Sequence, residues 1–302
     1  MTPRINRSWN LLLPLMNRRA VGHCILGNGV SLRGMTNEDA GSVLNGSVQC
    51  VFEDPITVFR QGAKCIYVDV PDPLPRDWDA FAINEAAKAQ FVLNMLSDSL
   101  KKPAIMSFAI VLSRAMVTRV ERVVSLPAIP DIRRLAAQSY RLTTSVNPAV
   151  ASRLYGIIDS VCRSHTEVFI TINRFNSCLT RSTWSDRIID AAICLESLIR
   201  SQQELRFKFA LHLSFISTST PQQRADTFEL LTDLYDVRSG LVHGSDTTAK
   251  LQKVQNQWDG VLRITKEALL YYFSYLETVR PMDWSNHLKA LVLGTEESII
   301  GR

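Results

Sequence analysis

Residues 234–244 are Leu-Tyr-Asp-Val-Arg-Ser-Gly-Leu-Val-His-Gly, a run that decides the fold of the C-terminal half of the chain. Counting back from Arg238, apolar side chains recur in steps of three and four at Phe228, Leu231 and Leu234, which is the spacing of one face of an amphipathic helix. The run therefore predicts the end of a helix whose buried face continues to Arg238. A guanidinium on a buried face needs a partner.

Gly240 decides whether the arginine of this run meets its histidine. On an unbroken helix with 3.6 residues per turn, His243 lies about 140° around the axis from Arg238. A glycine can end a helix in a left-handed turn. We therefore expect Gly240 to end this helix and to bring the imidazole back, so that both side chains share one pocket suited to phosphodiester chemistry.

Helical patterns surround this run from residue 147 onward. We expect helices at 148–163, with or without a bent continuation to residue 179, at 185–200 with Ser185 as the N-cap, at 203–216, at 222–238 and at 253–279. Short connections between long amphipathic helices are typical of an antiparallel bundle. We place the boundary between Thr143 and Asn147, which gives an N-terminal domain at 1–145 and a helical domain at 146–302.

The first 145 residues predict an α+β domain, so the fold class is an α+β domain followed by an all-α bundle. Strands are expected at 47–52 and 64–70, a hairpin turn at 28–29 and a helix at 77–100. The stretch 105–126 suits a β-hairpin about as well as a helix, and we favour strands. This domain contains no Gly-rich phosphate loop and no pair of catalytic carboxylates at a recognised spacing.

Composition limits the classes of protein to consider. The chain has 302 residues, 46% of them hydrophobic, and a formal net charge of +5 that does not by itself require a nucleic-acid partner. Its six cysteines form no Cys-x-x-Cys pair, and no histidine has a metal-ligand spacing, so we expect a reduced, cytoplasmic protein without structural zinc or a cofactor. No apolar run is long enough for a membrane span. The arginine-rich N-terminus suits an ordinary basic terminus better than an organellar transit peptide.

Four further residues are candidates for supporting roles around Arg238 and His243. Glu196 lies in an apolar stripe, where a carboxylate is costly unless it is paired. A helical hairpin could bring Arg206 within its reach, either as a structural ion pair or as a device that orients Arg206 or a residue of the 238–243 motif. Asp236 and Ser239 are candidates for orienting His243 or the arginine, or are solvated turn residues.

The chain resembles the HEPN superfamily, and within it the ApeA-like HEPN domain. The resemblance rests on residues 235–244 together with 192–199 and 204–211, and it covers about residues 148–280. It implies a helical bundle whose Arg-x4–6-His motif forms a metal-independent ribonuclease site, commonly shared across a homodimer, and a role in toxin, abortive-infection or antiviral defence systems. Mapped onto this chain, the motif residues are Arg238 and His243.

Two positions differ from patterns common in that family. Active members often have Asn, Asp or His after the motif arginine, where this chain has Ser239. One antitoxin-controlled branch has a tyrosine two residues after the histidine, where this chain has Ser245. In ApeA-like proteins the region before the bundle resembles a sensing or regulatory domain, which suggests a control function for residues 1–145.

The chemistry of such a site can be argued from the residues alone. RNA carries its own nucleophile, the 2′-hydroxyl, so cleavage needs a base, an acid and positive charge at the phosphorane, but no metal. Histidine is a common general base or acid in proteins, which suits His243 to either role, and the planar guanidinium of Arg238 can hold two phosphate oxygens. One histidine per chain is one too few, so we expect a homodimer that brings two motifs together.

The sequence thus predicts a metal-independent endoribonuclease that cleaves RNA, such as tRNA, and acts as a defence effector under a regulatory partner that the sequence does not name. The alternative is a non-catalytic module that binds nucleotide, RNA or a protein partner, with Arg238 as a phosphate clamp. A purely structural dimerisation domain is the third interpretation.

Overall fold

The structure is a computed structural model, and it describes residues 8–15, 18–19, 24–27, 29–45, 64–70, 74–97, 100, 103–106, 108–114, 118–126, 140–141, 148–199, 203–278 and 283–295. The chain divides into two compact units, Met1–Gly156 and Ile157–Arg302. The division falls inside helix α5 (Pro148–Ser164), a little after the segment 143–147 proposed from the sequence. The strand predicted at 47–52 lies outside the described residues.

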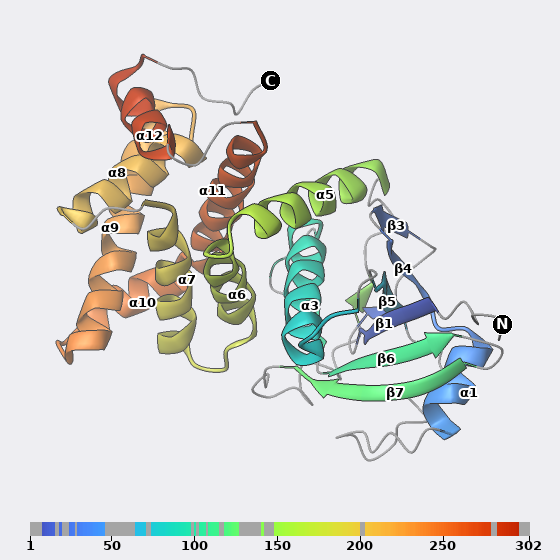
Figure 1. Ribbon diagram of the computed structural model, residues 1–302. Coiled ribbons are helices and arrows are strands. Elements are labelled where there is room, and N and C mark those ends of the chain that lie inside the picture. The colour runs from blue at the N-terminus through green and yellow to red at the C-terminus, as the bar shows by residue number, and fades with distance from the viewer. Residues whose placement is uncertain are drawn as a thin grey trace. The chain divides into compact units, whose positions relative to one another are not determined.

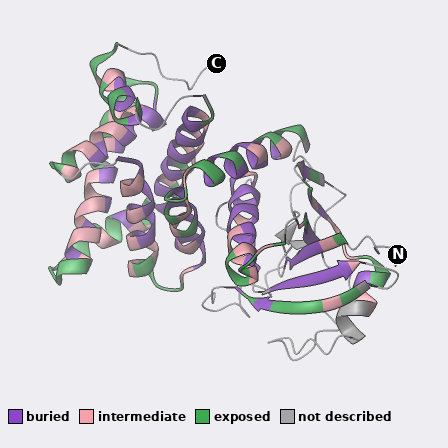
Figure 2. Cartoon of the chain, in the orientation of Figure 1, coloured by how far each residue is buried: buried purple, intermediate pink, exposed green. Residues whose placement is uncertain are grey.

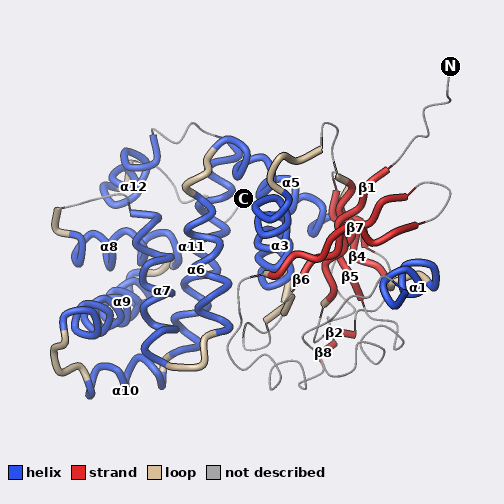
Figure 3. Tube along the Cα trace, turned by 60° about the horizontal axis from the view of Figure 1, so that its bottom comes forward, coloured by secondary structure: helices blue, strands red, loops and turns tan. Residues whose placement is uncertain are grey.

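The N-terminal unit is built on an antiparallel sheet of six described strands in the order β3-β4-β5-β1-β6-β7 (Figures 1 and 3). In chain order these are β1 (Ser8–Pro14), β3 (Cys24–Gly27), β4 (Val30–Gly34), β5 (Lys64–Asp69), β6 (Phe108–Arg114) and β7 (Thr118–Ser125). A short parallel pair, β2 (Arg18–Arg19) and β8 (Tyr140–Arg141), forms a second sheet. In the described residues of this unit the helices are α1 (Asn37–Asn45), α3 (Trp78–Met95) and the first half of α5.

The strand β1, which the sequence analysis did not predict, lies in the middle of the sheet between β5 and β6. Leu11, Leu12 and Leu13 have exposed fractions of 0%. A strand with neighbours on both sides and both faces covered needs no polar alternation, so a continuous apolar run suits it. The register pairs Leu12 with Tyr67 of β5 and with Ile110 of β6.

Two hairpins that the sequence predicted are confirmed. Residues 108–114 and 118–125 pair as antiparallel strands, with β6 buried and the edge strand β7 largely exposed (Figure 2). The turn between β3 and β4 contains Gly29 at φ +75°, where a Cβ would approach Asp69 Cβ to 2.9 Å. Glycine is required there because both its backbone conformation and the contact exclude a side chain.

A buried polar cluster connects α1 to the sheet. The carboxylate of Asp39, with an exposed fraction of 0%, accepts hydrogen bonds from Tyr67 Oη and Arg114 Nη2, each at 2.7 Å. Burial opposes its ionisation, but the hydrogen bonds from Tyr67 and Thr36 and the charge of Arg114 together hold the pKa of Asp39 below its ordinary value. The same burial raises the pKa of the Tyr67 hydroxyl. Asp39 therefore stays charged and Tyr67 stays neutral.

The C-terminal unit is all helical in its described residues, as the sequence predicted. Its helices after α5 are α6 (Val168–Thr180), α7 (Trp184–Ile199), α8 (Leu205–Ser217), α9 (Pro221–His243), α10 (Thr248–Asn256), α11 (Trp258–Thr278) and α12 (Trp284–Leu293). The three-residue connections 181–183 and 218–220 force α6 and α7, and α8 and α9, into antiparallel hairpins that pack along their lengths (Figure 1). No helix in the described part of the chain has the length and apolar composition needed to cross a membrane.

Several helix boundaries differ from the prediction. The first helix agrees with the predicted 148–163 to within one residue, and the continuation left open to residue 179 is the separate helix α6. By contrast, α10 and α11 are distinct helices where one was expected, and α12 was not predicted. The helix α7 is capped by Thr183 rather than Ser185, because Thr183 Oγ1 accepts from Asp186 N at 3.1 Å and donates to Asp186 Oδ2 at 2.7 Å.

Candidate functional site

The candidate site lies at the C-terminal end of α9, and the helix ends differently from the prediction. Thr220 caps its start by accepting from Gln223 N at 3.3 Å, with Pro221 in the first turn. The helix then runs unbroken through Gly240 to His243, and Gly244 adopts the left-handed conformation at φ +73°. The expectation that Gly240 ends the helix is wrong.

Gly240 has a packing function in place of the predicted turn. A Cβ at this position would lie 2.1 Å from Thr247 Cγ2, so only a residue without a side chain allows the following segment to cross the helix there. The carbonyl of Gly240 accepts from Gly244 N and, at 2.9 Å, from Ser245 N. Both bonds end on this one carbonyl of the last turn, as in the common glycine C-cap.

The unbroken helix keeps the two motif side chains apart within one chain. Five helical positions separate Arg238 from His243 by about 140° around the axis and roughly 7.5 Å along it. Arg238 is partly buried, with a side-chain exposed fraction of 23%, whereas His243 is exposed on the last turn. The single pocket that the sequence predicted for both groups is therefore not formed by a local turn.

Glu196 of α7 is the partner of Arg238. Arg238 Nη2 donates to Glu196 Oε2 at 3.1 Å, and the glutamate side chain is 13% exposed. Arg238 Nε and Glu196 Oε1 are buried and have no hydrogen-bond partner within the described chain. Burial raises the pKa of Glu196, and the nearby charge of Arg238 only partly offsets this effect. The pair is thus incompletely satisfied.

Arg206 does not pair with Glu196, contrary to the structural interpretation of the sequence. Its guanidinium forms a bidentate pair with Asp236 of α9, with Nε–Oδ1 at 2.5 Å and Nη2–Oδ2 at 2.8 Å. Lys250 of α10 also donates to Asp236. Hydrogen bonding by Arg206 is the main cause that lowers the pKa of Asp236 to about 2. Asp236 therefore links three helices and is not directed at the imidazole.

A second acid on α9 extends this charged network. Asp233 pairs with Lys253 at 2.6 Å and with Lys250 at 3.6 Å, which holds α10 against α9 next to the motif. Ser239 is half-buried on the turn after Arg238. Of the four supporting candidates, only Glu196 touches a motif residue.

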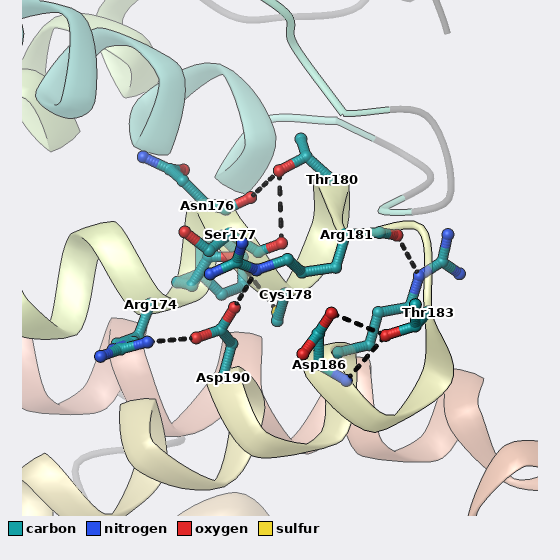
Figure 4. Close-up of polar contacts among 11 residues, drawn as sticks. Arg174, Asn176, Ser177, Cys178, Thr180, Arg181, Thr183, Asp186 and Asp190 are labelled. Carbon is teal, nitrogen blue, oxygen red and sulfur yellow. Dashed lines mark hydrogen bonds and ion pairs between the residues drawn. The ribbon is translucent and has the colours of Figure 1, made fainter. Parts of the chain in front are cut away.

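One cluster was not singled out from the sequence (Figure 4). Asp190 of α7, with an exposed fraction of 1%, accepts from Arg174 Nη1 of α6 at 2.6 Å and from Arg181 Nε at 2.7 Å. The signal available in the sequence was an aspartate within the apolar face of a predicted helix, the same signal that drew attention to Glu196. Its two arginine partners could not be identified without knowing how α6 lies on α7.

Comparisons with family models, with curated proteins and with solved structures find no match to this chain. In the described residues, no three His, Cys, Asp or Glu side chains gather in a way that could hold a metal ion. The function must therefore be argued from the arrangement itself: a partly exposed guanidinium and an exposed imidazole at one end of α9.

Proposed function

We propose that the chain is a HEPN-like, metal-independent endoribonuclease that cleaves cellular RNA, tRNA among its candidate substrates, and acts as a defence effector. The observation that carries the proposal is an exposed His243 on the last turn of α9, five positions after Arg238, whose side chain is 23% exposed and is held by Glu196 through Nη2. The Nε of Arg238 is buried, so the terminal N–H groups of this fixed guanidinium are the ones suited to phosphate oxygens.

The active unit in this proposal is a homodimer. Because α9 directs Arg238 and His243 to different sides, one copy does not offer both to the same phosphate. In a two-fold symmetric dimer that packs the C-terminal ends of the two α9 helices together, the histidine of one chain lies near the arginine of the other. Such a dimer also supplies two imidazoles. The exposed Val242, at 53%, adds an apolar contact beside His243 for that interface.

The reaction follows from these groups. One imidazole removes the proton of the 2′-hydroxyl, whose oxygen attacks the phosphorus, while a second imidazole protonates the departing 5′-oxygen. Arg238 stabilises the charge that develops on the phosphorane, and Glu196 positions Arg238. The products are a 2′,3′-cyclic phosphate and a free 5′-hydroxyl.

The test is RNA cleavage by the purified full-length chain in the presence of EDTA. We expect cyclic phosphate ends, a loss of about 10²–10⁴-fold in rate for His243→Ala, and about 10²–10³-fold for Arg238→Ala. Matched controls are His165→Ala in the connection before α6 and Arg263→Ala on the exposed face of α11, which should keep wild-type rates. Unchanged cleavage by folded His243→Ala would end the proposal.

A second candidate is a non-catalytic module that binds RNA, nucleotide or a protein partner. The ion pair between Arg238 and Glu196 favours it, because the arginine already has a carboxylate partner. Under this alternative the wild type binds RNA without cutting it, Arg238→Ala weakens binding, and His243→Ala changes nothing. A structural dimerisation domain predicts that neither substitution affects ligand binding.

A further inference from the structure

The α6–α7 hairpin carries three arginines. Arg174 lies in the middle of α6 and Arg181 ends that helix (Figure 4). Arg187 lies near the start of α7. The guanidiniums of Arg174 and Arg181 reach the same carboxylate, that of the buried Asp190. Arg187 Nε donates to the carbonyl oxygen of Arg181 at 2.7 Å. All three side chains are therefore held in place by bonds to α6, α7 or their connection.

Asp190 uses only a small part of the hydrogen-bonding capacity of its two arginines. Arg174 gives it Nη1 and Arg181 gives it Nε, and the other N–H groups of both have no partner in the part of the chain that the structure describes. The two side chains are 40% and 37% exposed, so these donors face solvent. A guanidinium group that is held through one nitrogen, with its other N–H groups open to solvent, is already positioned to bind a second oxyanion.

An aromatic side chain lies beside this arginine group. Trp184, at the start of α7, is 37% exposed, and the guanidinium of Arg187 lies 5.1 Å from its ring centroid. Its edge-to-face contact with the buried Trp258, at 5.6 Å between ring centroids, fixes the indole. Fixed aromatic rings next to arginines are the combination that binds the bases and phosphates of single-stranded nucleic acid.

Two guanidiniums of this surface, those of Arg174 and Arg181, share a single carboxylate, that of Asp190. Hydrogen bonding to Asp190 is the main cause that raises the pKa of Arg181, which therefore remains a cation at all relevant pH values. One negative charge thus holds two arginines in place without neutralising both of them.

We propose that Arg174, Arg181, Arg187 and Trp184 form a docking surface for the backbone of single-stranded RNA, separate from Arg238 and His243. The surface takes two or more neighbouring phosphates on the arginines and a base on the indole. The choice of RNA as the polyanion rests on the proposed function. The geometry of the arginines and the tryptophan is independent of that function.

The experiment measures RNA binding in a background that cannot cut. The probe is a fluorescein-labelled, mixed-sequence RNA of about twenty nucleotides, and the protein is full-length His243→Ala. Adding Arg187→Gln should weaken binding about fivefold at 0.1 M salt and lower the slope of log K against log salt by roughly 0.7, the value for one lost phosphate contact on a single strand. Trp184→Ala should weaken binding with little change in that slope.

Arg174→Gln is the second arginine variant, because glutamine can still donate to Asp190 and preserve the hairpin. Arg263→Gln on α11 is the matched control and should leave affinity and slope unchanged. The docking surface is overturned if Arg187→Gln and Arg174→Gln, both folded by circular dichroism, bind like the control, or if the background protein binds no RNA. If the wild type cleaves RNA but the arginine variants bind RNA normally, the docking surface is wrong and the nuclease proposal stands. If binding depends on the arginines but the wild type does not cleave RNA, the docking surface stands and the nuclease proposal is wrong.

Discussion

At the scale of single residues, Gly240 meets two requirements that oppose each other. A glycine inside a helix costs about 1 kcal/mol relative to alanine because of its backbone freedom. At this position the cost is offset by the contact with Thr247, whose Cγ2 occupies the space of a Cβ. The same contact keeps the segment after Gly244 against the end of α9.

Gly240→Ala is therefore expected to destabilise the helical unit by about 1–3 kcal/mol, the usual cost of overpacking. Gly156→Ala in α5, where no atom lies within 4 Å of the added carbon, should instead gain up to about 1 kcal/mol. Thermal unfolding followed by far-UV circular dichroism measures both. Adding Thr247→Ser removes Cγ2 and should restore stability to Gly240→Ala; failure of this rescue would contradict the packing explanation.

Asp236 makes the stability of the helical unit depend on pH. Its pKa of about 2 in the folded chain lies below the ordinary value of 3.8, so its contribution is present above about pH 4 and is lost as pH falls towards 2. Allowing for the exposure of Arg206 and Lys250, this contribution is about 1–2 kcal/mol.

We expect Asp236→Asn to unfold at lower urea concentration than the wild type at pH 7, and the two midpoints to converge as pH approaches 2. Asp226→Asn changes an exposed acid on the same helix and should have little effect at either pH. If the urea midpoints of Asp236→Asn and the wild type differ by the same amount at pH 7 and at pH 2, the charge of Asp236 is not the cause of the difference.

At the scale of elements, α6 and α7 depend on one buried charge. Asp190 is the common acceptor for Arg174 and Arg181, so its removal leaves two arginines without the group that orders them. Breaking a fully buried ion pair costs about 3–5 kcal/mol, and the partial exposure of these arginines lowers that figure.

Asp190→Asn should accordingly cost about 2–3 kcal/mol in the free energy of unfolding of the helical unit. Asp186→Asn, in the same hairpin, removes an exposed capping interaction and should cost no more than about 1 kcal/mol. Urea unfolding curves of the two variants provide the comparison. If both variants lose the same free energy of unfolding, Asp190 stabilises the hairpin no more than the exposed Asp186 does.

Local patterns were sufficient for elements whose periodicity is strong. The strand at 64–69, the hairpin of β6 and β7 and the helices α5 to α9 could be predicted from apolar periodicity and turn signals, whereas α12 was missed and α10 and α11 were expected as one helix. The strand β1 could not, because Leu11–Leu13 followed by Pro14 has no alternation, and only its place between two other strands explains it. The break at Gln257 carries no helix-breaking residue.

Pairings within the candidate site depended on information that the sequence does not contain. The acid near Arg238 and the arginine near Asp236 were each identified as candidates, but helix rotation decides that Glu196 meets Arg238 and that Arg206 meets Asp236. The sequence analysis expected the left-handed turn at Gly240, but Gly244 adopts it and Gly240 packs against Thr247.

At the scale of the whole molecule, the proposed nuclease requires two chains per site. A mixed dimer of wild type and His243→Ala contains one of the two catalytic imidazoles, so it should be nearly inactive. Adding an excess of His243→Ala to a fixed amount of wild type, at saturating RNA, should lower the measured rate several-fold. The same excess of His165→Ala should not lower it. A rate that does not respond to His243→Ala would indicate a site within one chain.

The position of β1 also has a consequence for synthesis. This strand is synthesised before the other described strands of the sheet, yet it cannot be enclosed until β6 follows, since Asn10 and its partner Arg114 are 104 positions apart. At a translation rate of about 5–20 residues per second, three adjacent leucines stay unshielded for roughly 5–20 seconds. The nascent chain therefore presents an apolar segment early, which makes Leu11–Leu13 prone to aggregation until β6 has been made.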